Sequence, residues 1–158
     1  MAKGRSKGRP GGRSPGRANV RMALLRQQRA LHELYPDDHV EIDREGRLVW
    51  RGWLSPSPLC HDYWVEVTWD GIGWPQTVVI EPKLVPPEGK EFQHVYPDGS
   101  LCLFMPGGWN HSMLIAKTII PWAKRWLLHH EIYLFTGEWT GGGHGTPIDE
   151  KLQEDGAA

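Results

Sequence analysis

Cysteine is scarce in this sequence of 158 residues, and long apolar runs are missing. The two cysteines, Cys60 and Cys102, are too few for a disulfide framework, and they lack the CxxC spacing of a structural zinc site. No stretch of about 18 apolar residues occurs, so we expect no membrane span, and the first residues lack the apolar segment of a secretory signal. These absences argue against a disulfide-rich secreted domain and favour a cytoplasmic protein with reduced thiols.

Acidic residues are absent from the first 32 positions, which contain nine Lys or Arg, whereas the rest of the chain holds 9 basic and 19 acidic residues, a balance of −10. Residues 1–18 are mostly Gly, Arg, Lys, Ser and Pro, so we predict a disordered basic tail that cannot bury enough surface to offset its ordering entropy. Such a tail serves either solubility or binding to an acidic surface. The lack of aromatic residues between the charges favours the former and argues against nucleic acid as a partner.

The remaining length suits a single folded domain, which we place at residues 19–140, with a flexible C-terminal tail at 141–158. Nine tryptophans provide large apolar area for its core or for a partner surface. The hydrophobic pattern predicts an α+β fold that begins with a helix from about Val20 to Leu34, capped by Asn19. The residues expected along its buried face, at helical spacing, are Leu24, Leu25, Gln28, Leu31 and Leu34.

Residues 40–42 alternate between apolar and polar, and the runs at 48–54, 63–69 and 77–80 are rich in strand-forming residues, so we predict an antiparallel meander of four strands. Two C-terminal helices are expected beyond a Pro-rich stretch and an irregular segment. Ser112 would cap the first, which reaches about Ile120, and Pro121 suits the first position of the second. That second helix would run to about Phe135 and end at Gly137.

Several other side chains have an expected environment. Trp50 and Trp53 fall on opposite faces of one predicted strand, so one should be buried and the other exposed to a partner. Of the adjacent His129 and His130 on the last helix, one should face the core and the other solvent. Cys60 and the histidine after it match no common zinc pattern, so we expect no metal site.

Cys102 is the candidate for chemistry, because a thiolate is the strongest nucleophile among ordinary side chains. It follows a turn sequence, Pro97-Asp98-Gly99-Ser100, which places it where an exposed loop meets a short strand. His94 precedes it by eight residues and His111 follows it by nine, so either imidazole can approach the thiol. From spacing alone, a lone cysteine before Leu and Phe is more often a small buried side chain.

The ordered set of features resembles the ubiquitin-conjugating enzymes, in the bacterial branch found in CBASS antiphage operons. In that family a His-Pro-Asn tripeptide precedes the nucleophilic cysteine, a leucine follows it, and a tryptophan comes a little later. Here Cys102-Leu103 and Trp109 match that pattern, Pro86-Pro87 resembles the family's Pro-Pro, and His94 stands at the tripeptide's histidine. The resemblance covers roughly residues 20 to 140 and implies the fold just described, with the active-site loop between the meander and the C-terminal helices.

The active-site segment departs from the family's pattern at two positions and in length. Val95 and Tyr96 stand where the family has Pro and Asn, and the spacing from His to Cys is two residues shorter than in the eukaryotic enzymes. In the family, that Asn holds the loop and stabilises an oxyanion. The available substitutes here are Asp98, Ser100 and Asn110.

The resemblance implies a ubiquitin-conjugating-like cysteine acyltransferase. Cys102 would take the C-terminal glycine of a partner protein as a thioester, and a target lysine would then attack it. His94 would organise the loop, Asp98 would help to deprotonate the amine, and no metal or organic cofactor would be needed. The resemblance also implies the partner, a cGAS/DncV-like nucleotidyltransferase. The alternative is a catalytically weak member of the same fold that recruits a partner through its aromatic surface.

Overall fold

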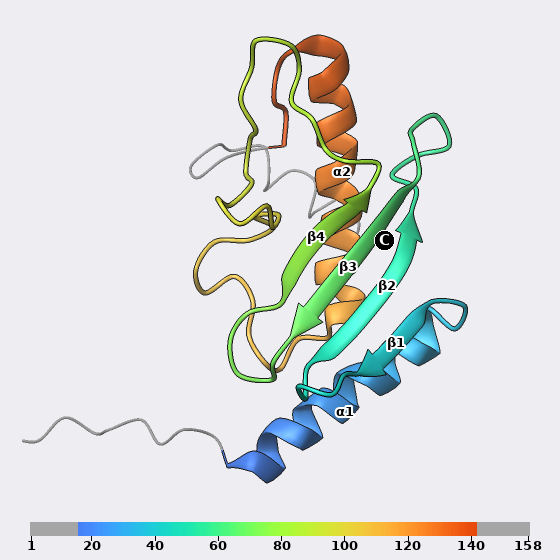
Figure 1. Cartoon of the computed structure of the whole chain (residues 1–158), viewed down its shortest axis with the longest axis vertical. Coiled ribbons are helices and arrows are strands. Elements are labelled where there is room, and N and C mark those ends of the chain that lie inside the picture. Colours follow the sequence, from blue (N-terminus) through green and yellow to red (C-terminus); the bar gives the residue numbers. More distant parts are fainter. Residues whose placement is uncertain (1–15, 142–158) are drawn as a thin grey trace, which may run out of the picture.

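Four antiparallel strands and two long helices form the part of the chain that the computed structural model describes, residues 16–141 (Figure 1). The elements are α1 (Arg17–Leu34), β1 (His39–Ile42), β2 (Leu48–Leu54), β3 (Tyr63–Trp69), β4 (Gln76–Glu81), the 3-10 turn η1 (Ile115–Lys117) and α2 (Ile119–Thr136). The α+β order expected from the sequence is confirmed. The tails expected at residues 1–18 and 141–158 lie almost wholly outside the described residues.

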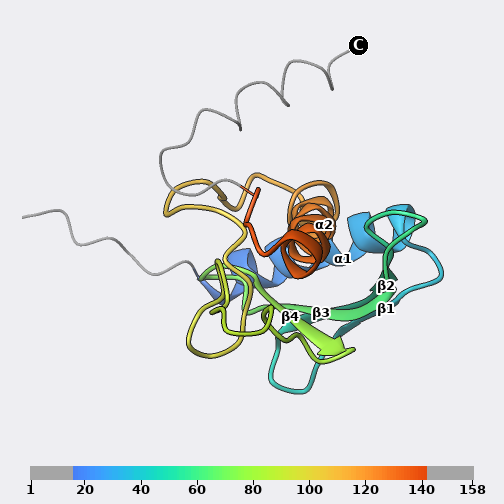
Figure 2. The same ribbon diagram turned by 90° about the horizontal axis from the view of Figure 1, so that it is seen from above.

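The strands are hydrogen-bonded in the order β1-β2-β3-β4, and every neighbouring pair is antiparallel. Figure 2 shows α1 and α2 on the same side of this sheet. Period-two alternation decides which side chains face them: Trp50 is fully buried, whereas Trp53 is 54% exposed, as the sequence predicts. Because the sheet ends at β4, the outer edge of that strand is open to other segments.

The buried face of α1 differs from the expected one. The helix begins at Arg17 behind Gly16, with no side-chain cap, so the prediction that Asn19 caps it was wrong. Leu25 and Leu34, expected in the core, are 39% and 49% exposed. The buried residues of α1 are Leu24, Gln27, Ala30 and Leu31.

Gln27 is buried because it satisfies the backbone of a distant segment. Its Nε2 donates to the Met113 carbonyl at 2.8 Å, and its Oε1 accepts from the Ile115 N–H at 2.8 Å. A buried amide with both ends bonded replaces water for two backbone groups. The side chain thus joins α1 to the chain that leads from the Cys102 segment into α2.

The two C-terminal helical segments begin at other residues than the sequence predicts. Ser112 does not cap a helix but donates to Asn110 Oδ1, and the helical turn between Ser112 and α2 is η1. Pro121 occupies the third position of α2 rather than the first, which is still within the first turn, where backbone N–H groups have no helical partner. Gly137 ends α2 with φ +72°, as predicted.

Of the histidine pair on α2, His130 faces the core as expected, but His129 does not face solvent alone, because its ring lies 6.1 Å from the Trp139 ring. His130 is 2% exposed and stacks on Trp126, with ring centroids 5.2 Å apart, whereas His129 is half-buried. Burial lowers the pKa of His130 below its ordinary value. None of the helices within residues 16–141 is long and apolar enough to cross a membrane.

Candidate active site

The Cys102 segment lies against the open edge of β4. The Leu101 N–H donates to the Thr77 carbonyl on β4 at 2.9 Å, and Leu101 is 4% exposed. This bond and the burial of Leu101 fix the position of the segment along the edge of β4. Cys102, the next residue, is half-buried.

The residues before Cys102 form a narrow hairpin. Its turn is closed by the Gly99 N–H, which donates to the Tyr96 carbonyl at 2.9 Å, and by the Tyr96 N–H, which donates to the Ser100 carbonyl at 2.8 Å. Gly99 has φ +86°, a left-handed conformation in which glycine avoids the strain of a side chain. A three-residue loop that ends in a left-handed glycine is a common hairpin connection, and Pro97-Asp98-Gly99 supplies it.

The hairpin register brings a tyrosine to the thiol. Val95 pairs with Leu101, and the Cys102 N–H donates to the His94 carbonyl at 2.8 Å. Since side chains alternate along paired strands, Val95 and Leu101 share one face, and Tyr96 and Cys102 are diagonal neighbours on the other. An aromatic side chain spans such a diagonal.

The phenol of Tyr96 interacts directly with the thiol. A side-chain hydrogen bond with Cys102, followed by partial burial, raises the pKa of Tyr96 above its ordinary value of 10.0. Tyr96 therefore keeps its proton near neutral pH and can donate it to sulfur. The thiol also lies 3.9 Å from the Phe104 carbonyl oxygen. Sequence reasoning placed no role on Tyr96, although the turn signature and the alternation contained the signal.

The backbone of His94 and its imidazole ring contact different neighbours. Its φ is +52°, an uncommon conformation for a residue with a side chain. Its carbonyl accepts from the Cys102 N–H, and its imidazole lies against the Trp139 indole, with ring centroids 5.6 Å apart and planes 31° apart. The structure thus brings the predicted His94 and Cys102 together through the backbone.

Asp98 sits at the tip of the turn with an exposed side chain. Its Oδ1 accepts from the Ser100 hydroxyl at 2.6 Å and from the Ser100 N–H at 2.9 Å. These two bonds hold the pKa of Asp98 below its ordinary value, so the carboxylate is ionised at neutral pH. Its charge in turn contributes to raising the pKa of Tyr96.

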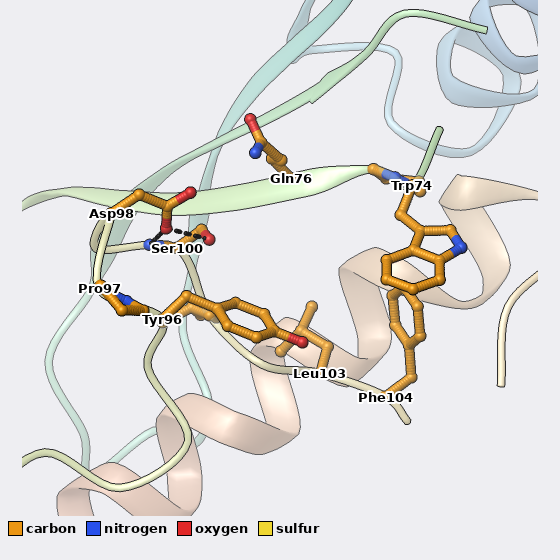
Figure 3. Close-up of a pocket in the computed structure, with 10 residues that line it drawn as sticks. Trp74, Gln76, Tyr96, Pro97, Asp98, Ser100, Leu103 and Phe104 are labelled. Atoms are coloured by element: carbon orange, nitrogen blue, oxygen red, sulfur yellow. Dashed lines mark hydrogen bonds between the residues drawn. The ribbon is translucent and has the colours of Figure 1, made fainter. Parts of the chain in front are cut away.

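A cavity of about 490 Å³ opens beside the hairpin (Figure 3). Aromatic and apolar side chains form most of its wall, and Asp98, Ser100 and Gln76 add polar groups. Trp74 meets Phe104 edge to face, with ring centroids 6.1 Å apart. Leu101 and Leu103, on either side of Cys102, both line the cavity. Its other lining residues are Pro75, Tyr96 and Pro97.

Two candidates beyond the cysteine are engaged elsewhere. His111 Nε2 lies 2.8 Å from the Ile72 carbonyl oxygen, in the turn between β3 and β4, and its ring packs on Trp69. Asn110 accepts both the N–H and the hydroxyl of Ser112 through its Oδ1. These contacts are with the β3–β4 turn and with the local backbone rather than with the hairpin.

The second cysteine lies in the loop between β2 and β3. Cys60 Sγ is 3.1 Å from the Ser57 hydroxyl. The next residue, His61, and Tyr63 both hydrogen-bond to Glu131 of α2, at 2.9 and 2.5 Å. Within residues 16–141, no group of three or more His, Cys, Asp or Glu could hold a metal ion.

An N-terminal helix, a four-stranded meander, a cysteine-bearing loop and a C-terminal helix on the same side of the sheet form a ubiquitin-conjugating-like layout. The chain belongs to the family of Type II CBASS E2 proteins, whose model matches residues 27–147. This confirms the resemblance found in the sequence and gives the chain an E2-like role in CBASS antiphage defence. No curated protein matches the chain.

Proposed function

We propose that this protein is a ubiquitin-conjugating-like acyltransferase that carries the C-terminal glycine of a partner protein as a thioester on Cys102. The observation that supports this best is the setting of the thiol. Cys102 is half-buried, its N–H is bonded to the His94 carbonyl at 2.8 Å, and the hairpin register places Tyr96 on the diagonal from it, where the phenol interacts with the thiol.

The proposed chemistry consists of two acyl transfers. The Cys102 thiolate attacks the carbonyl of an activated C-terminal glycine, so that the S–C bond forms as the bond to the activating group breaks. An amine nitrogen then attacks the same carbonyl, the N–C bond forms, and sulfur departs as the thiolate while the nitrogen's proton passes to solvent. Tyr96 takes part in both steps by donating its proton in a hydrogen bond to the negative charge that develops beside sulfur.

The cavity beside the hairpin suits a lysine as the attacking amine. Asp98 is ionised, so it attracts an ammonium group, and the apolar walls from Tyr96 and Leu103 suit the aliphatic part of the side chain (Figure 3). With its pKa lowered, Asp98 is a weak base. Its proposed role is therefore to hold and orient the amine rather than to keep its proton.

For the partner, we propose a cGAS/DncV-like nucleotidyltransferase that ends in glycine. Membership in the CBASS E2 family supports this choice, because these proteins act within CBASS antiphage defence. The Tyr96 phenol would act on the glycyl carbonyl whichever residues precede it. Recognition of the rest of the partner would fall to the surface around the cavity.

Co-expression with the partner, followed by gels run with and without reducing agent, tests the proposal. The wild type should give an adduct that a thiol reagent cleaves. Cys102→Ser should give an oxygen ester that resists the reagent, and Cys102→Ala should give none. Cys60→Ala is the matched control and should behave like the wild type. If wild type and Cys102→Ala bind the partner equally and neither forms an adduct, the protein is a binding module instead.

A further inference from the structure

The chain folds back after α2 and reaches the Cys102 hairpin. Figure 1 shows the segment beyond α2 running back beside the helix. Its tryptophan, Trp139, packs on Trp126 and Tyr133 of α2, with ring centroids 5.5 and 5.8 Å away, and on His94 at 5.6 Å. Residues 138–141, here named the strap, thus connect the end of α2 with the residue whose carbonyl holds the Cys102 N–H.

Local bonds fix the strap in this path. The Glu138 N–H donates to the Thr136 hydroxyl at 3.1 Å, and the Thr140 hydroxyl lies 3.0 Å from His129 Nδ1. The backbone at Gly141 passes so close to the Trp139 ring that an added Cβ would lie 2.7 Å from Cζ2. The indole is therefore held on several sides.

The same end of α2 holds the chain just before His94. The Tyr133 hydroxyl donates to the Glu91 carbonyl at 2.9 Å. Glu91 is thus hydrogen-bonded to an aromatic residue near the end of α2, and His94 packs against another. The short stretch between them has little freedom to move away from the hairpin.

We propose that Trp139 is a positioning residue for Cys102 that acts through His94. Contact with the indole holds the imidazole and keeps His94 in its left-handed conformation, which aims the His94 carbonyl at the Cys102 N–H. A non-glycine residue adopts that conformation only when its surroundings impose it. The proposal rests on the proposed function, because it gives Trp139 a role in the chemistry of the Cys102 thiol.

Hydrogen exchange of backbone amides in the full-length chain, followed by NMR, tests this link. Trp139→Ala should speed exchange of the Cys102 N–H on the order of tenfold, as expected for the loss of an aromatic contact. The Leu101 N–H, which is bonded to Thr77, should keep its protection and serves as an internal reference. Trp139→Phe should restore most of the protection, and Trp53→Ala, which truncates an exposed tryptophan of the sheet, should change neither amide.

A second variant separates positioning from general packing. His94→Gly adopts the left-handed conformation without help. In that background, Trp139→Ala should no longer change exchange at Cys102. If Trp139→Ala instead loosens Leu101 and the sheet amides as much as Cys102, or leaves Cys102 protected, Trp139 is only a core residue and the proposal is overturned.

Adduct formation provides the functional readout. In Trp139→Ala, the rate of thioester formation at saturating partner should fall by about the same factor as the protection of Cys102, while the affinity for the partner stays unchanged. An unchanged rate overturns the role of Trp139 even if the wild type forms the adduct. Loosening of Cys102 in a protein whose wild type forms no adduct supports the positioning by Trp139 and contradicts the proposed function.

Discussion

Removing one hydroxyl, in Tyr96→Phe, is the sharpest test of the hairpin's chemistry. The ring and its packing beside Leu103 remain, and only the donor to Cys102 sulfur is lost. A hydrogen bond to a charged group contributes about 1.5–3 kcal/mol. Because Tyr96 is 45% exposed, water partly replaces the lost donor, so we expect about 1.5 kcal/mol, or roughly a tenfold slower thioester formation.

The pH dependence of this loss follows from the direction of the pKa shift. The pKa of Tyr96 is raised above 10.0, so the phenol keeps its proton throughout the physiological range. Ionisation of Tyr96 should therefore not change the ratio of wild-type to Tyr96→Phe rates between about pH 6 and 9. A raised folded-state pKa also means that the phenol's contribution to stability is complete below its unfolded value and is lost only at higher pH.

The assay is single-turnover adduct formation with excess partner, quenched without reducing agent. Tyr35→Phe is the matched control, because it removes a phenol hydroxyl that donates to the Ala116 carbonyl at 3.1 Å, far along the chain from Cys102. It should lower stability slightly and leave the rate unchanged. A Tyr96→Phe rate equal to wild type, or a loss that grows steeply with pH, would refute the assigned role of the phenol.

Three further changes test the fold around the site. Gln27→Leu leaves the Met113 carbonyl and the Ile115 N–H without partners, so urea unfolding should show a loss of about 2–4 kcal/mol. Gly99→Ala meets no neighbouring atom but forces a side chain into a left-handed turn, which should cost about 1 kcal/mol and slow adduct formation. His130→Phe should flatten the loss of stability below about pH 6.5, because a histidine whose folded pKa is lowered stabilises above its unfolded pKa and less below it.

Each of these changes has a control at a comparable residue. Gln28→Leu, one position along α1, should shift stability by less than about 0.5 kcal/mol. Gly73→Ala places its Cβ 3.7 Å from a carboxylate oxygen, an ordinary contact without a left-handed φ, and should be neutral. His32→Phe changes an exposed histidine of α1 and should leave the acid limb of the stability curve as it is. A control that matches its test variant contradicts the corresponding argument.

The sheet could be predicted from the sequence because strand alternation is a local pattern. All four strands and their antiparallel order follow from it, and Gly137 marks the end of α2 for the equally local reason that glycine accepts φ +72°. The buried face of α1 could not be predicted, because Gln27 is drawn inside by backbone groups about 86 residues away. The helical spacing pointed to its neighbour Gln28 instead.

In the candidate site, too, the local features could be predicted from the sequence and the tertiary contacts could not. The turn around Gly99 is visible in the sequence and fixes which residues lie opposite Cys102, so the position of Tyr96 was within reach of the pattern. The contact between His94 and Trp139 was not, since it depends on how the chain returns after α2. Proximity of that kind is a property of tertiary packing rather than of spacing.

The hairpin before Cys102 also determines where evolution or engineering can change chain length. Residues added at the tip, between Pro97 and Gly99, would enlarge the loop and move Asp98, but they would leave the paired residues and the nucleophile where they are. One residue added between Ser100 and Leu101 would turn the thiol into the core and expose Leu101, because a single step along a strand reverses every side chain that follows. A peptide tag or a crosslinking handle is therefore best inserted at the tip, within reach of the thiol.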